Sequence, residues 1–221
     1  MRVSSTHPVV PRPVLAGGQS TTRIVQAELD VKSWATRLPT AEEVRPARCP
    51  SCSVASRPAG GRIVLHGHGL RARDQWGPLD VTASPGVGEI RCRRYACQRC
   101  GAVVLVVPRG ILQRRLYSAS AVALALALWG VEGLAPAEVR RRVSPWRKVG
   151  ATAAASWASL RRWARAVRAA ALFAVVRATP AGARLREVAA RAATTLAAFA
   201  PSSADALPLA TRAMLGAAHV S

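Results

Sequence analysis

The sequence predicts a mixed α+β protein, with a small three-stranded zinc ribbon followed by a helical, helix-turn-helix-like region. Three observations support this fold class. Two Cys-x-x-Cys pairs enclose an interval rich in strand-forming residues, the chain changes to helical hydrophobic spacing after residue 108, and the 221 residues carry a formal net charge of +21. The apolar content is mostly Ala and Val, which favours small modules over one thick core.

Residues 1–47 contain few features that indicate a structure. Residues 1–23 are rich in Pro, Ser, Thr and Gly and are expected to form a disordered arm, because they offer little apolar surface to bury. Residues 24–47 form a short N-terminal segment whose apolar spacing fits a strand or a short helix, and Pro39 to Glu43 resembles a helix start. Neither stretch carries a motif that indicates a function.

Residues 48–108 carry the predicted zinc ribbon. Each Cys-x-x-Cys pair can supply two thiolates from one tight turn, so two pairs complete a closed tetrahedral site for Zn²⁺. Alternating residues predict strands at 62–72, 87–95 and 102–107. Gly101, directly after the last cysteine, fits a position that requires positive φ. With Zn²⁺ as the cofactor, the predicted metal ligands are Cys49, Cys52, Cys97 and Cys100.

Two alternatives for these cysteines remain open. The motif Cys-Pro-x-Cys also occurs in redox proteins, where the first thiolate lies at a helix N-terminus that lowers its pKa. Residues 53–61 are poor helix formers because they contain Pro58, Gly60 and Gly61, which disfavours that alternative. The second alternative is a ribbon that has lost its metal and keeps the cysteines as remnants.

Other residues of the ribbon also have expected roles. Cys92 is expected to be a small buried hydrophobic residue rather than a ligand. His66 and His68 share one strand face and could bind zinc or phosphate, although a surface or packing role is commoner for such residues. A tetrathiolate zinc site carries a net charge of about −2. Neighbouring arginines are expected to compensate it, namely Arg48, Arg91, Arg93, Arg94 and Arg99.

Residues 116–170 are expected to form the helix-turn-helix-like module. Ser118 can cap a helix at 119–129, and Pro136 suits the first turn of a short helix at 137–143. A third helix, from Ser156, is apolar on one side and basic on the other. The order of helix, turn and recognition helix makes its basic face the predicted DNA-binding surface, formed by Arg161, Arg162, Arg165 and Arg168.

The arginines of the basic face are expected to make different contacts with DNA, and a simpler alternative without DNA binding exists. Arg161 and Arg165 lie four residues apart on one face and are expected to read bases, whereas Arg162 is rotated by about 100° and is expected to contact the DNA backbone. The alternative is an ordinary amphipathic helix with a solvated arginine face. Residues 171–221 form an Ala-rich helical tail, for example a helix at 183–200, whose sparse large side chains suggest weak packing or a homodimer contact.

The ribbon resembles a known family. Cys-Pro-x-Cys, a strand carrying His-Gly, and then Arg93-Arg94-Tyr95-x-Cys97-x-x-Cys100 is similar to the zinc ribbon that precedes the helix-turn-helix of bacterial insertion-sequence transposases and related uncharacterised proteins. The likeness covers about residues 48–165 and implies the zinc-ligand role for the four cysteines. In that family a tight turn joins the two helices, whereas here residues 145–155 intervene.

Charge and composition indicate the partner and the compartment. Nearly all the positive charge is arginine, whose planar donors suit phosphate and guanine edges, so DNA is the expected partner. No apolar run reaches the roughly 20 residues of a membrane span, and no signal-peptide pattern is present, which predicts a cytoplasmic protein without membrane contact. Cysteines stay reduced in that compartment, which favours metal binding over disulfides.

The function predicted from sequence is zinc-dependent DNA binding without catalysis. Strand-transfer chemistry in transposases needs three carboxylates that hold two metal ions. The acids after Cys100 are few and lie in helical or Ala-rich surroundings, so the chain resembles only the DNA-recognition end of a transposase, whether as a regulator or a truncated relic. The alternative is a zinc-ribbon module that docks on another protein, with its basic faces solvated.

Overall fold

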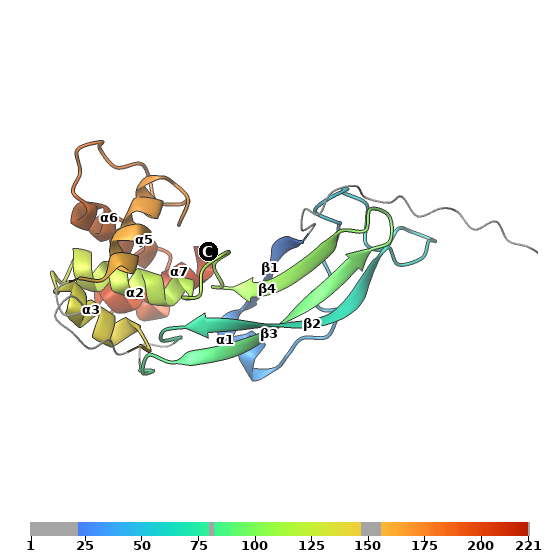
Figure 1. Ribbon diagram of the computed structural model, residues 1–221, viewed down its shortest axis with the longest axis horizontal. Helices are drawn as coiled ribbons and strands as arrows, with labels where there is room; N and C mark the ends of the chain where they lie inside the picture. The colour runs from blue at the N-terminus through green and yellow to red at the C-terminus, as the bar shows by residue number, and fades with distance from the viewer. Residues whose placement is uncertain (1–21, 80–81, 147–155, 221) are drawn as a thin grey trace, which may run out of the picture.

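The computed structural model describes residues 22–79, 82–146 and 156–220. It is an α+β structure in which a sheet occupies one end of an elongated molecule and most of the helices occupy the other (Figure 1). The expected disordered arm, residues 1–23, therefore lies outside the described residues except for its last two positions. No helix in the described part of the chain is long and apolar enough to cross a membrane.

The sheet contains four strands within the described residues, one more than the sequence predicts. They are β1 (Arg23–Asp30), β2 (Leu65–Trp76), β3 (Val87–Cys97) and β4 (Val103–Arg109), in the spatial order β1-β4-β3-β2. The three strands expected in the ribbon are present as β2 to β4, with antiparallel pairing and shifted ends. The correction is β1, which pairs with β4 in parallel. The spacing of apolar residues in this segment fits either a strand or a short helix, so the sequence alone does not decide between them.

Helix α1 (Val31–Thr36) and the residues after it lie against the sheet. Asp30 caps α1, because its carboxylate accepts hydrogen bonds from the backbone N–H groups of Lys32 and Ser33. The buried Trp34 donates its indole N–H to the carbonyl of Arg91 on β3, at 2.9 Å. Tyr95, which is fully buried on the same strand, donates its hydroxyl to the carbonyl of Ala41 at 2.7 Å. The N-terminal segment is thus part of the sheet's own core.

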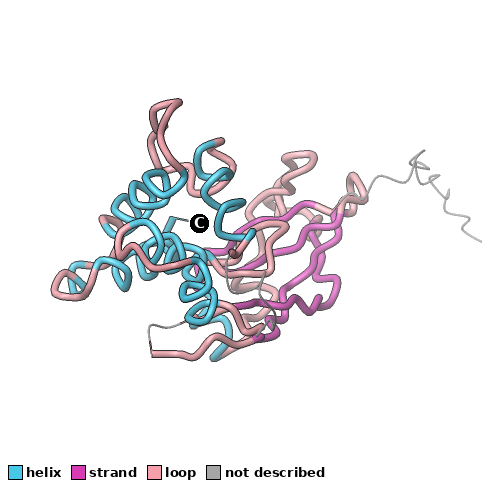
Figure 2. Tube along the Cα trace, turned by 60° about the vertical axis from the view of Figure 1, so that its left-hand side comes forward, coloured by secondary structure: helices cyan, strands magenta, loops and turns pink. Residues whose placement is uncertain are grey.

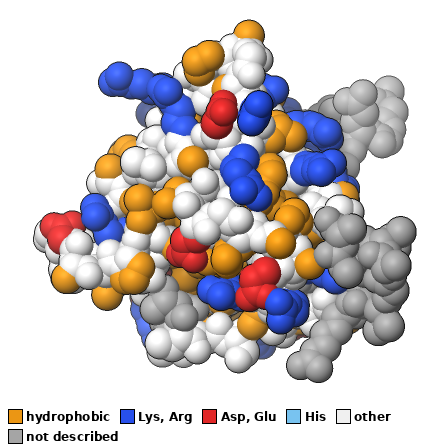
Figure 3. Space-filling model, turned by 90° about the vertical axis from the view of Figure 1, so that its left-hand side faces the viewer, with side chains coloured by type: hydrophobic (Ala, Val, Ile, Leu, Met, Phe, Trp, Pro, Cys, Tyr) orange, Lys and Arg blue, Asp and Glu red, His pale blue; other side chains and the backbone are white. Residues whose placement is uncertain are grey.

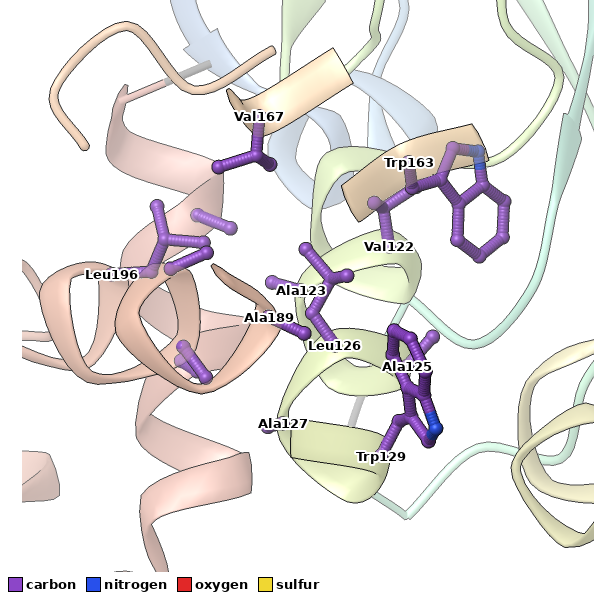
Figure 4. Packing of buried hydrophobic residues seen from close by; sticks show 14 of the residues in the cluster. Val122, Ala123, Ala125, Leu126, Ala127, Trp129, Trp163, Val167, Ala189 and Leu196 are labelled. Carbon is purple, nitrogen blue, oxygen red and sulfur yellow. The ribbon is translucent and has the colours of Figure 1, made fainter. Parts of the chain in front are cut away.

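Helix α2 is the centre of the helical end. Ser118 caps it as expected, accepting a hydrogen bond from the N–H of Ala121 at 3.0 Å. Ten of its twelve residues are buried, so it packs on several sides rather than along the single stripe that the sequence suggests (Figure 4). Around it lie α3, which starts at Pro136 as expected, and three further helices. Their bounds are α2 (Ala119–Gly130), α3 (Pro136–Val143), α5 (Ala158–Arg168), α6 (Leu185–Ala197) and α7 (Leu209–Val220).

The Ala-rich tail is closely packed, which corrects the expectation of weak packing. Helices α6 and α7 both contact α2 and each other. A Cβ atom added at Gly216 on α7 would overlap the carbonyl oxygen of Leu196 on α6, and one at Gly130 on α2 would overlap the backbone of Ala190. Small side chains therefore allow the helix backbones to approach closely. Contacts between the backbones then supply the packing that large side chains would otherwise provide. A homodimer through these helices stays a prediction.

The sheet and the helices are joined at the end of β2. Trp76 donates its backbone N–H to Leu116 and accepts one from Ser118, which places its ring in the helical core. The indole packs edge-on against Tyr117 with ring centroids 5.5 Å apart. Figure 2 shows the strands running up to the helices at this junction. The aromatic cluster contains Trp76, Tyr117, Trp146, Trp157 and Trp163, all in edge-to-face pairs.

The predicted helix-turn-helix is described only in part. Helix α5 forms where the sequence predicts a third helix, starting two residues later than expected. Both α3 and α5 contact α2. The connection between them includes residues 147–155, which lie outside the described residues, so the geometry of a turn between the two helices stays a prediction.

The close approach of α6 and α7 gives the first testable prediction. Gly216→Ala should lower the free energy of unfolding by roughly 1–3 kcal/mol, because the added methyl group forces two backbones apart. In an uncrowded helix the same change would stabilise by about 0.5–1 kcal/mol. Urea unfolding of both proteins gives the difference.

Gly182→Ala is the matched control, since an added Cβ there meets no atom within 4 Å. Its unfolding free energy should stay equal or rise slightly. Equal stability of Gly216→Ala and the wild type would mean that α6 and α7 do not pack at this distance.

Candidate metal centre

The four predicted ligands meet at the end of the sheet farthest from the helices (Figure 1). Cys97 ends β3 and Cys100 lies in the turn to β4, while Cys49 and Cys52 lie in the loop before β2. The Sγ atoms of all four lie within 4.8 Å of one another. Residues that are 45 or more positions apart in sequence thus form one site, as the paired motifs predict.

The sulfur separations match a tetrahedral metal site. The Sγ atoms of Cys49 and Cys100 are 3.8 Å apart, and those of Cys52 and Cys97 are also 3.8 Å apart. Four thiolates at a Zn–S distance of about 2.3 Å occupy corners about 3.8 Å from one another. A disulfide would instead require about 2.05 Å. The donor set and its spacing therefore fit a metal ion that prefers four sulfur ligands.

The two cysteine turns share one backbone pattern. In the first, the N–H of Ser53 bonds to the carbonyl of Cys49 and the N–H of Cys49 to the carbonyl of Val54. In the second, Gly101 bonds to Cys97 and Cys97 to Ala102 in the same way. Gly101 has φ +72°, as expected, and Ser53 takes the equivalent position at φ +57°. Ser53 directly follows Cys52 as Gly101 follows Cys100, so the repeat of the motif could have revealed its role.

Backbone N–H groups point at the sulfur atoms. The N–H of Val54 hydrogen-bonds the sulfur of Cys52, and the N–H of Ala102 bonds that of Cys100. The sulfur of Cys97 accepts two such bonds, from Arg99 and Cys100. These donors stabilise negative charge on sulfur and orient the ligands. They supply part of the compensation that the sequence assigns to arginine side chains.

The thiols differ in their ease of ionisation. Burial raises the pKa of the Cys97 thiol to about 12. Burial also opposes ionisation of Cys100, but the N–H of Ala102 and hydrogen bonds from the other three thiols lower the pKa of Cys100 to about 7. Binding of a metal by all four sulfurs therefore requires release of protons that burial otherwise retains.

The sequence reasoning missed one buried arginine, which binds the backbone of the residue opposite Cys97 and pairs with Glu42. Arg45 is almost fully buried and donates to the carbonyl of Leu65, the residue that pairs with Cys97 across the sheet. Its guanidinium also lies 5.5 Å from the centre of the Tyr95 ring. Of the five arginines expected to compensate the site, Arg48 donates to the carbonyl of Ser53 in the first cysteine turn at 3.0 Å. A buried arginine cannot be recognised from its position in a run of polar residues.

The fifth cysteine and the two histidines lie outside the sulfur cluster. Cys92 is fully buried within the core of the sheet, as expected, and burial raises the pKa of its thiol to about 11. His66 and His68 are exposed on β2. Within the described residues, the metal-binding group consists of the four motif cysteines.

The predicted DNA-binding arginines lie at the opposite end of the molecule, on α5. Leu160, Trp163 and Val167 bury one side of this helix, and all four arginines are exposed on the other. Arg161, Arg162 and Arg165 line one concavity of about 330 Å³ at the start of α5, so the structure brings together residues that the sequence assigns to different roles. Arg168 donates to the carbonyl of Ala183.

Comparisons of the chain with protein-family models, curated proteins and solved structures found no match.

The sulfur cluster gives a prediction about metal content and stability. Protein purified under reducing conditions should contain about one zinc ion per chain. Cys97→Ser should lose the metal and unfold the sheet, because a structural zinc contributes on the order of 10 kcal/mol of apparent binding free energy. Metal analysis and circular dichroism measure the two effects.

Cys92→Ala is the control, because it removes a buried sulfur that lies outside the cluster. It should keep the zinc content of the wild type and lose less stability. Wild-type protein without bound metal, or a loss of zinc in both variants, would contradict the assignment of the ligands.

Proposed function

We propose that this chain is a zinc-dependent DNA-binding protein without catalytic activity, related to the DNA-recognition end of insertion-sequence transposases. The observation that carries the proposal is the basic face of α5. None of the ion pairs among the described residues involves Arg161, Arg162 or Arg165. On α3, by contrast, Arg141 and Arg142 are both paired with Glu138.

Arginines that lie on a firmly anchored helix, outside the ion pairs of the described residues, suit a polyanion. Phosphates bind arginine through charge-assisted hydrogen bonds, and binding releases the counterions that surround DNA. Helix α5 is rigidly seated, since Leu160 is fully buried and Trp163 packs on two aromatic rings. The net charge of +21 adds long-range attraction for DNA. Figure 3 shows this helical end of the molecule, with many basic side chains and few acidic ones.

The helical end contains four acids, Glu132, Glu138, Glu187 and Asp205. They support binding without catalysis, because all but Glu132 already have other roles. Glu138 pairs with two arginines of its own helix. Glu187 accepts the backbone N–H of Arg184 at the start of α6, and Asp205 lies 3.7 Å from Arg212. Carboxylates used for capping and ion pairing suit a recognition module better than a two-metal catalytic centre.

The zinc ion has a structural role in this proposal. It holds together the two cysteine turns at the far end of the sheet. Strand β2 runs from that end to Trp76, which packs in the helical core. A cytoplasmic location fits the proposal, since thiols stay reduced there and remain available to metal.

The proposal predicts unequal effects of single arginine substitutions on duplex binding. Arg161→Ala and Arg165→Ala should each weaken binding by roughly 1–3 kcal/mol and relax sequence preference. Arg162→Ala should weaken binding to all sequences alike and reduce the salt slope by about one. Fluorescence anisotropy with several duplexes at two salt concentrations measures these effects.

Arg141→Ala is the matched control, since it also removes one exposed charge but from a residue paired with Glu138. It should change affinity little. Equal, small losses in all four variants would mean that α5 is only a solvated basic face, and the alternative of a protein-docking zinc ribbon would then be favoured.

A further inference from the structure

The loop between α5 and α6 forms a second surface that duplex recognition by α5 does not use. This loop, residues 169–184, is the arch beside α6 in Figure 1. Leu172, Phe173 and Val176 are buried and anchor it in the helical core. Because these three buried residues fix the loop, the surface between the loop and α6 has a defined shape.

Two concavities lie along this surface and share Arg191. The first has a volume of about 540 Å³. It is lined by Val175, Arg177, Arg191, Thr194, Thr195 and Phe199. The second has a volume of about 410 Å³ and includes Thr179, Ala183, Glu187 and Arg191. These two concavities are called together the α6 groove.

The α6 groove combines an exposed aromatic ring with unpaired positive charge. Phe199 is 44 % exposed, and among the described residues its ring takes part in none of the aromatic pairs. Arg177 and Arg191 belong to none of the ion pairs of the described residues. Glu187 is the acid that lines the groove, and its carboxylate already accepts the N–H of Arg184 at 2.8 Å.

We infer that the α6 groove binds unpaired nucleotides of a single-stranded nucleic acid. Phe199 stacks on a base, and Arg177 and Arg191 contact the phosphates on either side of it. The hydroxyl of Thr194 donates to the carbonyl of Ala190 at 3.0 Å and so keeps its oxygen available as an acceptor for a base N–H. Aromatic stacking together with a basic groove is the usual chemistry of single-strand binding.

The surface favours unpaired nucleotides over duplex DNA and over a peptide. In a duplex the base faces are covered by neighbouring base pairs, so an exposed phenyl ring gains nothing from them. An acidic peptide would satisfy the two arginines, but the large apolar side chains exposed in the groove are limited to Phe199 and Val175. One flat ring and two cations that line the same concavity match one base and its two flanking phosphates.

The α6 groove lies next to the basic face of α5. Arg168, the last residue of α5, donates to the carbonyl of Ala183, and Ala183 lines the groove. A strand that leaves a duplex at α5 can therefore continue into the groove. This continuity rests on the proposed function, whereas binding of a free single strand does not.

The test uses the full chain with labelled single strands of about ten nucleotides. A thymidine strand should bind more tightly than an abasic strand of equal charge. Phe199→Ala should weaken binding of the thymidine strand about fivefold to a hundredfold and abolish its advantage over the abasic strand. Phe199→Tyr should restore it. Arg177→Ala and Arg191→Ala should weaken both strands and lower the salt slope.

Two control variants remove similar side chains elsewhere. Leu207→Ala removes an apolar side chain of similar exposure, and Arg71→Ala removes an exposed charge on β2. Leu207→Ala should leave single-strand binding unchanged, and Arg71→Ala should weaken it less than Arg177→Ala or Arg191→Ala. Equal affinity for the thymidine and abasic strands, or no effect of Phe199→Ala, would overturn the inference. So would Phe199-dependent binding of an acidic peptide by a protein that ignores the thymidine strand.

The same variants separate this inference from the proposed function. Phe199→Ala should leave duplex binding unchanged, while Arg161→Ala should weaken it. If duplex binding is absent but thymidine-strand binding depends on Phe199, the α6 groove stands and the role of α5 fails. If duplex binding depends on Arg161 but Phe199→Ala has no effect on single-strand binding, the role of α5 stands and the α6 groove fails.

Discussion

The insertion of Trp76 into the helical core is the contact on which the relation between the two ends of the molecule depends. The sheet and the helices have separate hydrophobic cores, and Trp76 is the residue of β2 that packs into the helical one. Gly77 follows with φ +92°, and a Cβ atom there would lie 2.5 Å from that of Ala121. Arg73 reinforces the junction by donating to the carbonyls of Leu112 and Arg115. The sulfur cluster at the start of β2 and the helical core at its end are therefore linked through the sheet.

Local signals in the sequence predicted local structure well. The capping hydroxyl of Ser118, the position of Pro136 and the glycine after Cys100 each fix a backbone feature within a few residues, and each is found where it was expected. The four sulfurs could also be brought together from sequence, because a metal imposes its own geometry on distant residues. The predicted strands failed only at their ends, where tertiary contacts decide how far pairing extends.

The remainder depends on contacts that no local pattern encodes. The parallel pairing of β1 with β4 joins residues about 80 positions apart, and the spacing of β1 alone did not separate strand from helix. The Ala-rich tail appeared too poor in large side chains to pack well. In the structure the absence of a side chain at Gly216 is what lets α7 reach the backbone of α6. Low side-chain volume weakens a core only where the backbones stay apart.

The arginines differ in their partners, and this difference links the fold to the proposed function. Arg45, Arg73 and Arg93 are buried or partly buried and donate to backbone carbonyls, so their charge serves the fold. Other arginines instead face solvent around concave surfaces, namely Arg161, Arg162 and Arg165 on α5 and Arg177 and Arg191 in the α6 groove. A protein that needed only solubility could neutralise such clusters with nearby acids, as α3 does with Glu138. Charge left uncompensated on rigid helices is repelled by its own neighbours, and an anionic partner relieves that repulsion. Under the proposed function, uncompensated charge beside a concave surface, rather than total charge, marks where a nucleic acid would bind.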